Sequence, residues 1–128
     1  MTSRMDSSQF GDIDDESCRN FEAAVVLVGR RWTAAILLAI GRHAERFTDI
    51  RRHLNGITDP VLAQRLKELE GNNLISRTVI PTTPVQVRYE LTERGRELLA
   101  GLAPLNLWYQ KWHAADRAPV TPGTGGPS

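Results

Sequence analysis

Few side chains of this sequence belong to the types that carry out covalent or metal chemistry, and those few are dispersed. One cysteine, Cys18, is present, which excludes an intramolecular disulfide. The histidines, His43, His53 and His113, stand far apart, and no HExxH, CxxC or glycine-rich phosphate-loop motif occurs. An enzyme would need a nucleophile with a base, or a cluster of metal ligands. The sequence therefore predicts no catalysis and neither a bound metal nor a cofactor.

Basic side chains, in contrast, gather in one stretch, and such groups are the natural partners of phosphate. The basic residues of this stretch are Arg42, Arg46, Arg51, Arg52, Arg65 and Lys67. The whole chain has a net charge of only +1, because residues 1–17 are acidic whereas residues 18–113 carry fourteen Arg and Lys against nine Asp and Glu. This uneven distribution is compatible with a polyanionic partner.

The elements that must position these groups follow from the spacing of apolar residues. Over residues 18–28 they recur every three or four positions, which predicts an amphipathic helix that ends at Gly29. The carboxylates before Cys18 are suited to cap this helix. Residues 32–40 are apolar nearly all round, which predicts a second helix in the centre of the core.

Two further helices are expected on either side of a tight turn. Thr48 is the expected cap of a short third helix that ends before the turn signal Asn55-Gly56. Thr58 is the expected cap of the next helix, with Pro60 in its first turn, where a missing N–H has no cost. The expected buried stripe of this fourth helix consists of Leu62, Leu66 and Leu69.

A hairpin and a long helix complete the pattern. Residues 74–80 and 85–91 are rich in β-forming residues and are joined by a Pro-Thr-Thr-Pro sequence, which predicts an antiparallel pair. Thr92 then caps a last helix over residues 93–113, in which Pro104 predicts a kink or a break. The predicted fold class is mainly α with a small β-hairpin (α+β).

This order of elements is that of a helix-turn-helix followed by a hairpin wing. The major groove of DNA is about 12 Å wide and admits one α-helix, so the fourth helix would present its exposed side chains to base edges. Gln64 and Arg65 are the candidates for reading bases. Thr48, Arg52 and Lys67 are the candidates for contacts to phosphate. The full set predicted to contact double-stranded DNA is Arg31, Thr48, Arg51, Arg52, Thr58, Pro60, Val61, Gln64, Arg65, Lys67, Arg77, Gln86 and Arg88.

The sequence has a cysteine before the first helix, followed by the blocks VGRRWTAAILLAI, RFTDIRRHLNGIT, VLAQRLKELEGNNLISRTV and VRYELTERGREL. In these blocks the sequence resembles HxlR-type winged-helix regulators, over about residues 18–112. The resemblance implies a prokaryotic homodimer that binds a pseudo-palindromic operator, with one recognition helix per half-site, and repression as its default action. It also implies that the N- and C-terminal helices are dimerisation helices that pack across a two-fold axis.

The apolar stripes on the first and last helices have no other evident partner in so small a core, so dimerisation would bury them. The residues predicted at this interface are Phe21, Val25, Val28, Leu98, Leu102, Leu105, Tyr109 and Trp112. The chain departs from the family pattern in its wing, where the family often has a basic residue at Gln86 and an acidic one at Arg88. Pro104 also stands later than the proline common in the last helix of the family.

Cys18 occupies the position of a cysteine that senses oxidants or electrophiles in some members of the family. Helix amides and Arg19 would stabilise a thiolate there, whereas the neighbouring carboxylates oppose it. The alternative interpretation is a small buried residue at the dimer interface. A small-molecule aromatic effector is a separate hypothesis, although aromatic residues are more often core. The side chains that would hold it are Phe21, Trp32, Trp108, Tyr109 and Trp112.

The predicted organisation is a flexible acidic tail over residues 1–16, one domain over residues 17–114 and a disordered Pro/Gly-rich tail over residues 115–128. No stretch approaches the roughly 20 apolar residues of a membrane span, and the N-terminus is acidic rather than a basic leader. A cytoplasmic protein without membrane contact is therefore expected. The alternative use of such a fold is a protein–protein interaction module without DNA binding.

Overall fold

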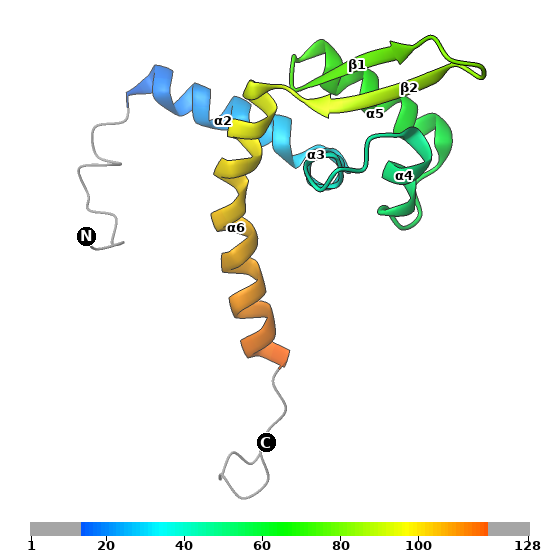
Figure 1. The fold of residues 1–128 in the computed structure, drawn as a ribbon. Helices are drawn as coiled ribbons and strands as arrows, with labels where there is room; N and C mark the ends of the chain where they lie inside the picture. Colours follow the sequence, from blue (N-terminus) through cyan, green and yellow to red (C-terminus); the bar gives the residue numbers. More distant parts are fainter. Residues whose placement is uncertain (1–13, 118–128) are drawn as a thin grey trace, which may run out of the picture.

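A computed structural model describes residues 14–117 of the chain (Figure 1). In chain order its elements are α2 (Asp15–Gly29), α3 (Thr33–Gly41), α4 (Phe47–Arg52), α5 (Asp59–Gly71), β1 (Ile75–Ile80), β2 (Gln86–Leu91) and α6 (Glu93–Arg117). The predictions made for residues 1–13 and 118–128 lie outside the described residues. Helices α3, α4 and α5 pack beside the β1–β2 hairpin, while α2 and α6 extend away from this body (Figure 1).

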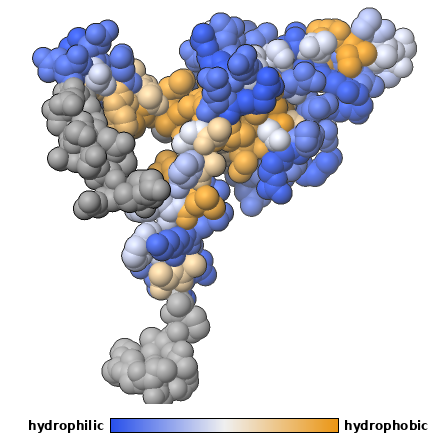
Figure 2. Space-filling view, turned by 60° about the vertical axis from the view of Figure 1, so that its left-hand side comes forward, coloured by the Kyte–Doolittle hydropathy of each residue, from blue (hydrophilic) through white to orange (hydrophobic). Residues whose placement is uncertain are grey.

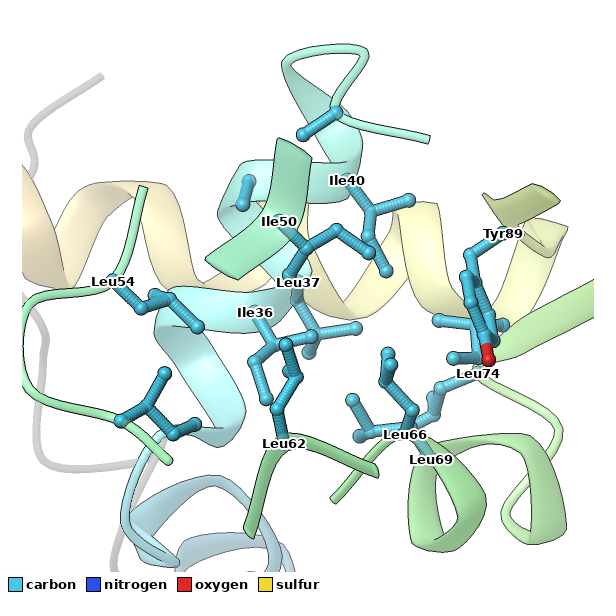
Figure 3. Packing of buried hydrophobic residues seen from close by; sticks show 14 residues of the cluster. Ile36, Leu37, Ile40, Ile50, Leu54, Leu62, Leu66, Leu69, Leu74 and Tyr89 are labelled. Carbon is cyan, nitrogen blue, oxygen red and sulfur yellow. The ribbon is translucent and has the colours of Figure 1, made fainter. Parts of the chain in front are cut away.

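Helix α3 is the centre of the hydrophobic core, as the apolar run predicts. Ile36 and Leu37 are 0% exposed, and the predicted stripe of α5 packs around them (Figure 3). Tyr89 from β2 closes the same cluster. The core thus contains residues of α3, α4, α5 and both strands of the hairpin. The buried face of α5 packs against these elements, which fixes the position of the helix.

The caps of the helix-turn-helix are partly as predicted. Thr58 caps α5, since its hydroxyl accepts a hydrogen bond from the backbone N–H of Val61 at 3.4 Å. The expectation that Thr48 caps the short helix is wrong, because α4 begins at Phe47 and its N-cap is Arg46, which makes no side-chain cap bond. Phe47, the first residue of α4, packs against the core, and this contact fixes where the helix begins.

The hairpin is antiparallel, with a register that runs from Ile75 opposite Leu91 to Ile80 opposite Gln86. The backbone N–H of Tyr89 also donates to the carbonyl of Glu45 at 2.8 Å, which ties β2 to the segment before α4. Thr92 follows β2 as the predicted cap of α6, because its hydroxyl accepts from the N–H of Gly95 at 3.0 Å.

The two outer helices are longer than the sequence suggested. The carboxylate of Asp14 accepts from the N–H of Ser17 at 2.8 Å and starts α2 at residue 15, so Asp15 and Glu16 are helical although the predicted domain begins at residue 17. Helix α6 continues to Arg117, so residues 115–117 are helical too.

Of the kink or break expected at Pro104, the break does not occur, since α6 runs through this residue. A proline inside a helix removes one backbone donor, and the carbonyl that loses it belongs to Ala100, an exposed residue that water can reach. No single helix within residues 14–117 is both long and apolar enough to cross a membrane; α2 and α3 together have the length but meet at 73°.

Candidate nucleic-acid interface

The outer face of α5 is formed by Pro60, Gln64 and Lys67, which stand four and three residues apart and are all exposed. They lie on the side of the helix opposite to the buried stripe. Thr58, just before the helix, is exposed as well, and Val61 is half-buried beside it. A helix fixed by its apolar side thus presents two polar side chains, those of Gln64 and Lys67, that are suited to hydrogen bonding in a groove.

Arg65, the second candidate for reading bases, does not belong to this row. Its side chain is only 15% exposed, and its Nε donates to the backbone carbonyl of Arg31 at 3.3 Å. Its Nη1 lies 3.3 Å from the carboxylate of Glu68. The reason is its place on the helix, because position 65 flanks the buried stripe and turns toward the connection between α2 and α3.

The arginines of α4 lie on the surface beside α5 and are paired with carboxylates. Arg51 Nη1 is 3.0 Å from the carboxylate of Asp59, and Arg52 Nη1 is 3.3 Å from that of Asp49. Exposed pairs of this kind contribute little energy, so the guanidinium groups can exchange a carboxylate for a phosphate at low cost. Thr48 is exposed on the same short helix.

The wing does not bring its three predicted contact residues to one face. Arg77 pairs across the ladder with Tyr89, whereas Gln86 and Arg88 point to the other face of the hairpin. Both are held against the segment before α4: the Nη2 of Arg46 donates to Gln86 at 3.2 Å, and the Nη1 of Arg88 lies 3.5 Å from Glu45. The Nε of Arg88 is buried without a hydrogen-bond partner among the described residues.

The sequence analysis missed a pair that joins α5 to the connection before α3. Nε and Nη2 of Arg30 donate to the two carboxylate oxygens of Glu68 at 2.9 and 3.0 Å. These bonds hold the pKa of the Glu68 carboxyl below its ordinary value and raise that of Arg30 above its own. The spacing of Arg65 and Glu68 is visible in the sequence, but a partner 38 residues away is not. Arg31, next in the chain, is exposed, with its guanidinium 4.9 Å from the ring centre of Trp32.

Apolar side chains are exposed on both outer helices, as the predicted dimer faces require. On α2, Phe21 is 71% exposed, and on α6 Trp108 is 59% exposed. Figure 2 shows this apolar surface on α2 and along α6 among hydrophilic residues. The predicted interface residues Val25, Leu105, Tyr109 and Trp112 are likewise exposed, while Val28, Leu98 and Leu102 are half-buried.

The five aromatic residues considered for an effector are not gathered in one place. Trp108 and Tyr109 line a hollow of about 490 Å³ between α3 and α6. Trp32 instead packs against the core, and neither Phe21 nor Trp112 lines that hollow. Cys18, in the first part of α2, has an exposed free thiol in the described chain.

The fold and this surface define a winged helix-turn-helix protein, and comparison with known proteins gives the family. The model of the HxlR-like helix-turn-helix family matches residues 27–117, and the chain belongs to this family of transcriptional regulators. The prediction made from the sequence blocks is thereby confirmed.

Relatives and solved structures agree with this assignment. The chain is 38% identical over 97 residues to YvaP of Bacillus subtilis, an uncharacterised HTH-type transcriptional regulator, covering 76% of this chain and 90% of YvaP. It is 40% identical over 91 residues to the regulator YodB of the same organism, covering 71% and 81%. The structure of diamide-treated YodB superposes with a TM-score of 0.64 at 38% identity over 74% of this chain and 94% of that one. The redox regulator HypR in its oxidised form superposes with a TM-score of 0.62 at 29% identity over 79% and 99%.

Proposed function

We propose that this protein is a homodimeric repressor that binds a pseudo-palindromic operator in double-stranded DNA through helix α5. The observation that carries the proposal is the exposed row of Pro60, Gln64 and Lys67 on a helix whose opposite face is fully buried. A helix that reads DNA needs one face packed on the core and the opposite face accessible to the groove, and α5 has both.

Each part of the surface has a distinct task in this proposal. Gln64 donates and accepts a pair of hydrogen bonds at an adenine edge. Lys67, Arg52 and Thr48 contact phosphates and fix the register of the helix on the duplex. Arg51 joins them once phosphate replaces Asp59 as its partner.

The wing has a smaller part in this proposal than the helix pair. Arg77 is exposed on the hairpin and is free to approach the backbone beside the groove. Gln86 and Arg88 contact DNA only if they leave Arg46 and Glu45, their partners in this structure. The buried and unpartnered Nε of Arg88 makes such a rearrangement less costly for this residue.

Dimerisation is proposed through the exposed apolar faces of α2 and α6. Large side chains such as Phe21, Leu107 and Trp108 are more than half exposed in the single chain, and exposed apolar side chains of this size on two helices support a site of association. A two-fold interface would set the two α5 helices on the same side of the DNA, about one helical turn of roughly 34 Å apart.

A salt titration of DNA binding tests this proposal. Affinity of the purified protein for a fragment from upstream of its own coding region, and for a random fragment of the same length, is measured between 50 and 200 mM salt. Several phosphate contacts predict a fall in affinity of about 10³-fold or more over this range, with the upstream fragment bound more tightly throughout. Absence of binding to either fragment at low salt would favour the protein–protein interaction module.

We further infer that the exposed thiol of Cys18 makes DNA binding sensitive to oxidants. The likeness to diamide-treated YodB and to oxidised HypR supports this second proposal. Because the sequence has one cysteine, an oxidant such as diamide would take up two hydrogens as a disulfide forms between Cys18 of two copies, or between Cys18 and a small thiol. Loss of operator binding after diamide in the native chain, but not in Cys18→Ser, is the expected result.

A further inference from the structure

Few contacts fix the orientation of helix α2 relative to the rest of the chain. It has no buried residue, and its partly buried Leu27, near its C-terminal end, packs against the core. The direction of α2 therefore depends on its last turn and on the short connection to α3.

That connection is attached to α5 at two successive residues. The side chain of Arg30 makes two parallel hydrogen bonds to Glu68, and the carbonyl of Arg31 accepts from Arg65. Arg65 also donates to Glu68 at 3.3 Å, so both links meet on one carboxylate. A planar guanidinium that bonds a carboxylate through two nitrogens fixes an orientation as well as a distance.

From this geometry we propose that Arg30, Glu68 and Arg65, here named the Glu68 link, are positioning residues that set the angle between the reading helix α5 and the dimerisation helix α2. The link rests on the function proposed above, in which α2 lies at the two-fold axis and α5 enters the groove. In the dimer it then fixes the separation of the two α5 helices, and with it the separation of the half-sites that the protein accepts.

The energetics favour a role in geometry over a role in stability. The side chains of Arg30 and Glu68 are 50% and 33% exposed, and pairs in such contact with water add little to the free energy of unfolding. None of the three residues belongs to the exposed row of Pro60, Gln64 and Lys67, because Arg65 and Glu68 flank the buried stripe of α5 and Arg30 lies outside this helix.

The test measures how strongly binding depends on half-site separation. Operators with the best separation and with two base pairs inserted are compared for the native chain, Arg30→Ala, Glu68→Ala and the double variant. The native chain is expected to prefer the correct separation by about tenfold or more, because the two reading helices are held in register. Each single variant is expected to reduce this preference to about threefold or less, and the double variant to reduce it no further, as required of residues that act as one unit.

Glu68→Gln and Glu45→Ala complete the set. The first keeps the size and hydrogen-bonding capacity of residue 68. A lowered preference in Glu68→Gln could therefore not be explained by loss of folding. The second removes the carboxylate of another half-exposed pair, Glu45 with Arg88, that does not involve α5. Any DNA contact made by the released Arg88 would change the affinity for both operators alike, so the preference for one separation should stay unchanged. A preference that stays within about twofold of the native value in all Arg30 and Glu68 variants would overturn the role of the link. Failure of the native chain to bind any operator would instead overturn the proposed function, and the link with it.

Discussion

Arg51 of α4 and Asp59, the first residue of α5, form an ion pair of 3.0 Å across the turn of the helix-turn-helix. The pair places a negative charge on the surface that is proposed to face DNA, and it occupies a guanidinium that phosphate would otherwise attract. The pair therefore opposes DNA binding until phosphate replaces the carboxylate.

Asp59→Asn is expected to strengthen binding to any DNA fragment by about two- to tenfold at low salt, because it removes one repulsive charge and frees Arg51. The matched control is Glu93→Gln, which removes the acidic first residue of α6, far along the chain from this surface. Filter binding or fluorescence anisotropy on random DNA measures the change. Equal affinity of Asp59→Asn and the native chain would show that Arg51 takes no part.

Substitution of Gly95 in α6 tests how closely this helix packs against the backbone at Leu74. A side chain at this position would collide with the backbone carbonyl of Leu74, whereas nothing lies near a side chain added at Gly101 in the same helix. Gly95→Ala should lower the free energy of unfolding by about 1–3 kcal/mol through overpacking. Gly101→Ala should raise it by about 0.5–1 kcal/mol, as expected of alanine in an exposed helix interior. Chemical denaturation measures both; similar values for the two variants would contradict the packing described here.

Phe21 tests the proposed dimer face. Its side chain is 71% exposed, so Phe21→Lys should leave the fold intact while placing a charge in an apolar interface. The expected result is a dissociation constant for the dimer that is raised about tenfold or more, measured by sedimentation equilibrium. Glu22→Lys, an exposed neighbour outside the predicted interface set, is the control. A Phe21→Lys protein that dimerises as the native chain does would exclude this part of α2 from the interface.

Glu68 makes the stability of the chain depend on acid pH. Its pKa in the folded chain is lowered by the hydrogen bonds from Arg30, so its carboxylate contributes stability above the ordinary glutamate pKa of about 4.3. That contribution is lost as the pH falls through the lower, folded value. Between pH 6 and pH 3 the native chain should lose more stability than Glu68→Gln does. Because both partners are exposed to water, the difference is expected to be small, and identical profiles would argue that the pair is open in solution.

The fold was largely predictable because its signals are local in the sequence. The stripe of Leu62, Leu66 and Leu69 and the apolar run of α3 each specify a buried face without reference to any other segment. The cap at Thr58 is likewise set within four residues. Local spacing did not predict where α4 begins, since Phe47 is held by the core and not by its neighbours.

The contact surface was harder to predict, because side-chain direction depends on partners that are distant in sequence. Arg65 turns inward toward Arg31, 34 residues earlier, and Gln86 is held by Arg46, 40 residues earlier. Residue type alone made both candidates for DNA contact. The helical position of Arg65, beside Leu62 and Leu66, was the one available sign that it flanks the buried face.

The central claim, that the outer face of α5 reads base sequence, is tested most directly by the specificity ratio of Gln64→Ala. This ratio is the affinity for the upstream fragment divided by that for random DNA at one fixed salt concentration. Loss of a bidentate contact in each of two half-sites predicts a ratio reduced by about tenfold or more, with affinity for random DNA nearly unchanged. Gln110→Ala, the same substitution at an exposed position of α6, should keep the native ratio. An unaltered ratio in Gln64→Ala would contradict the claim.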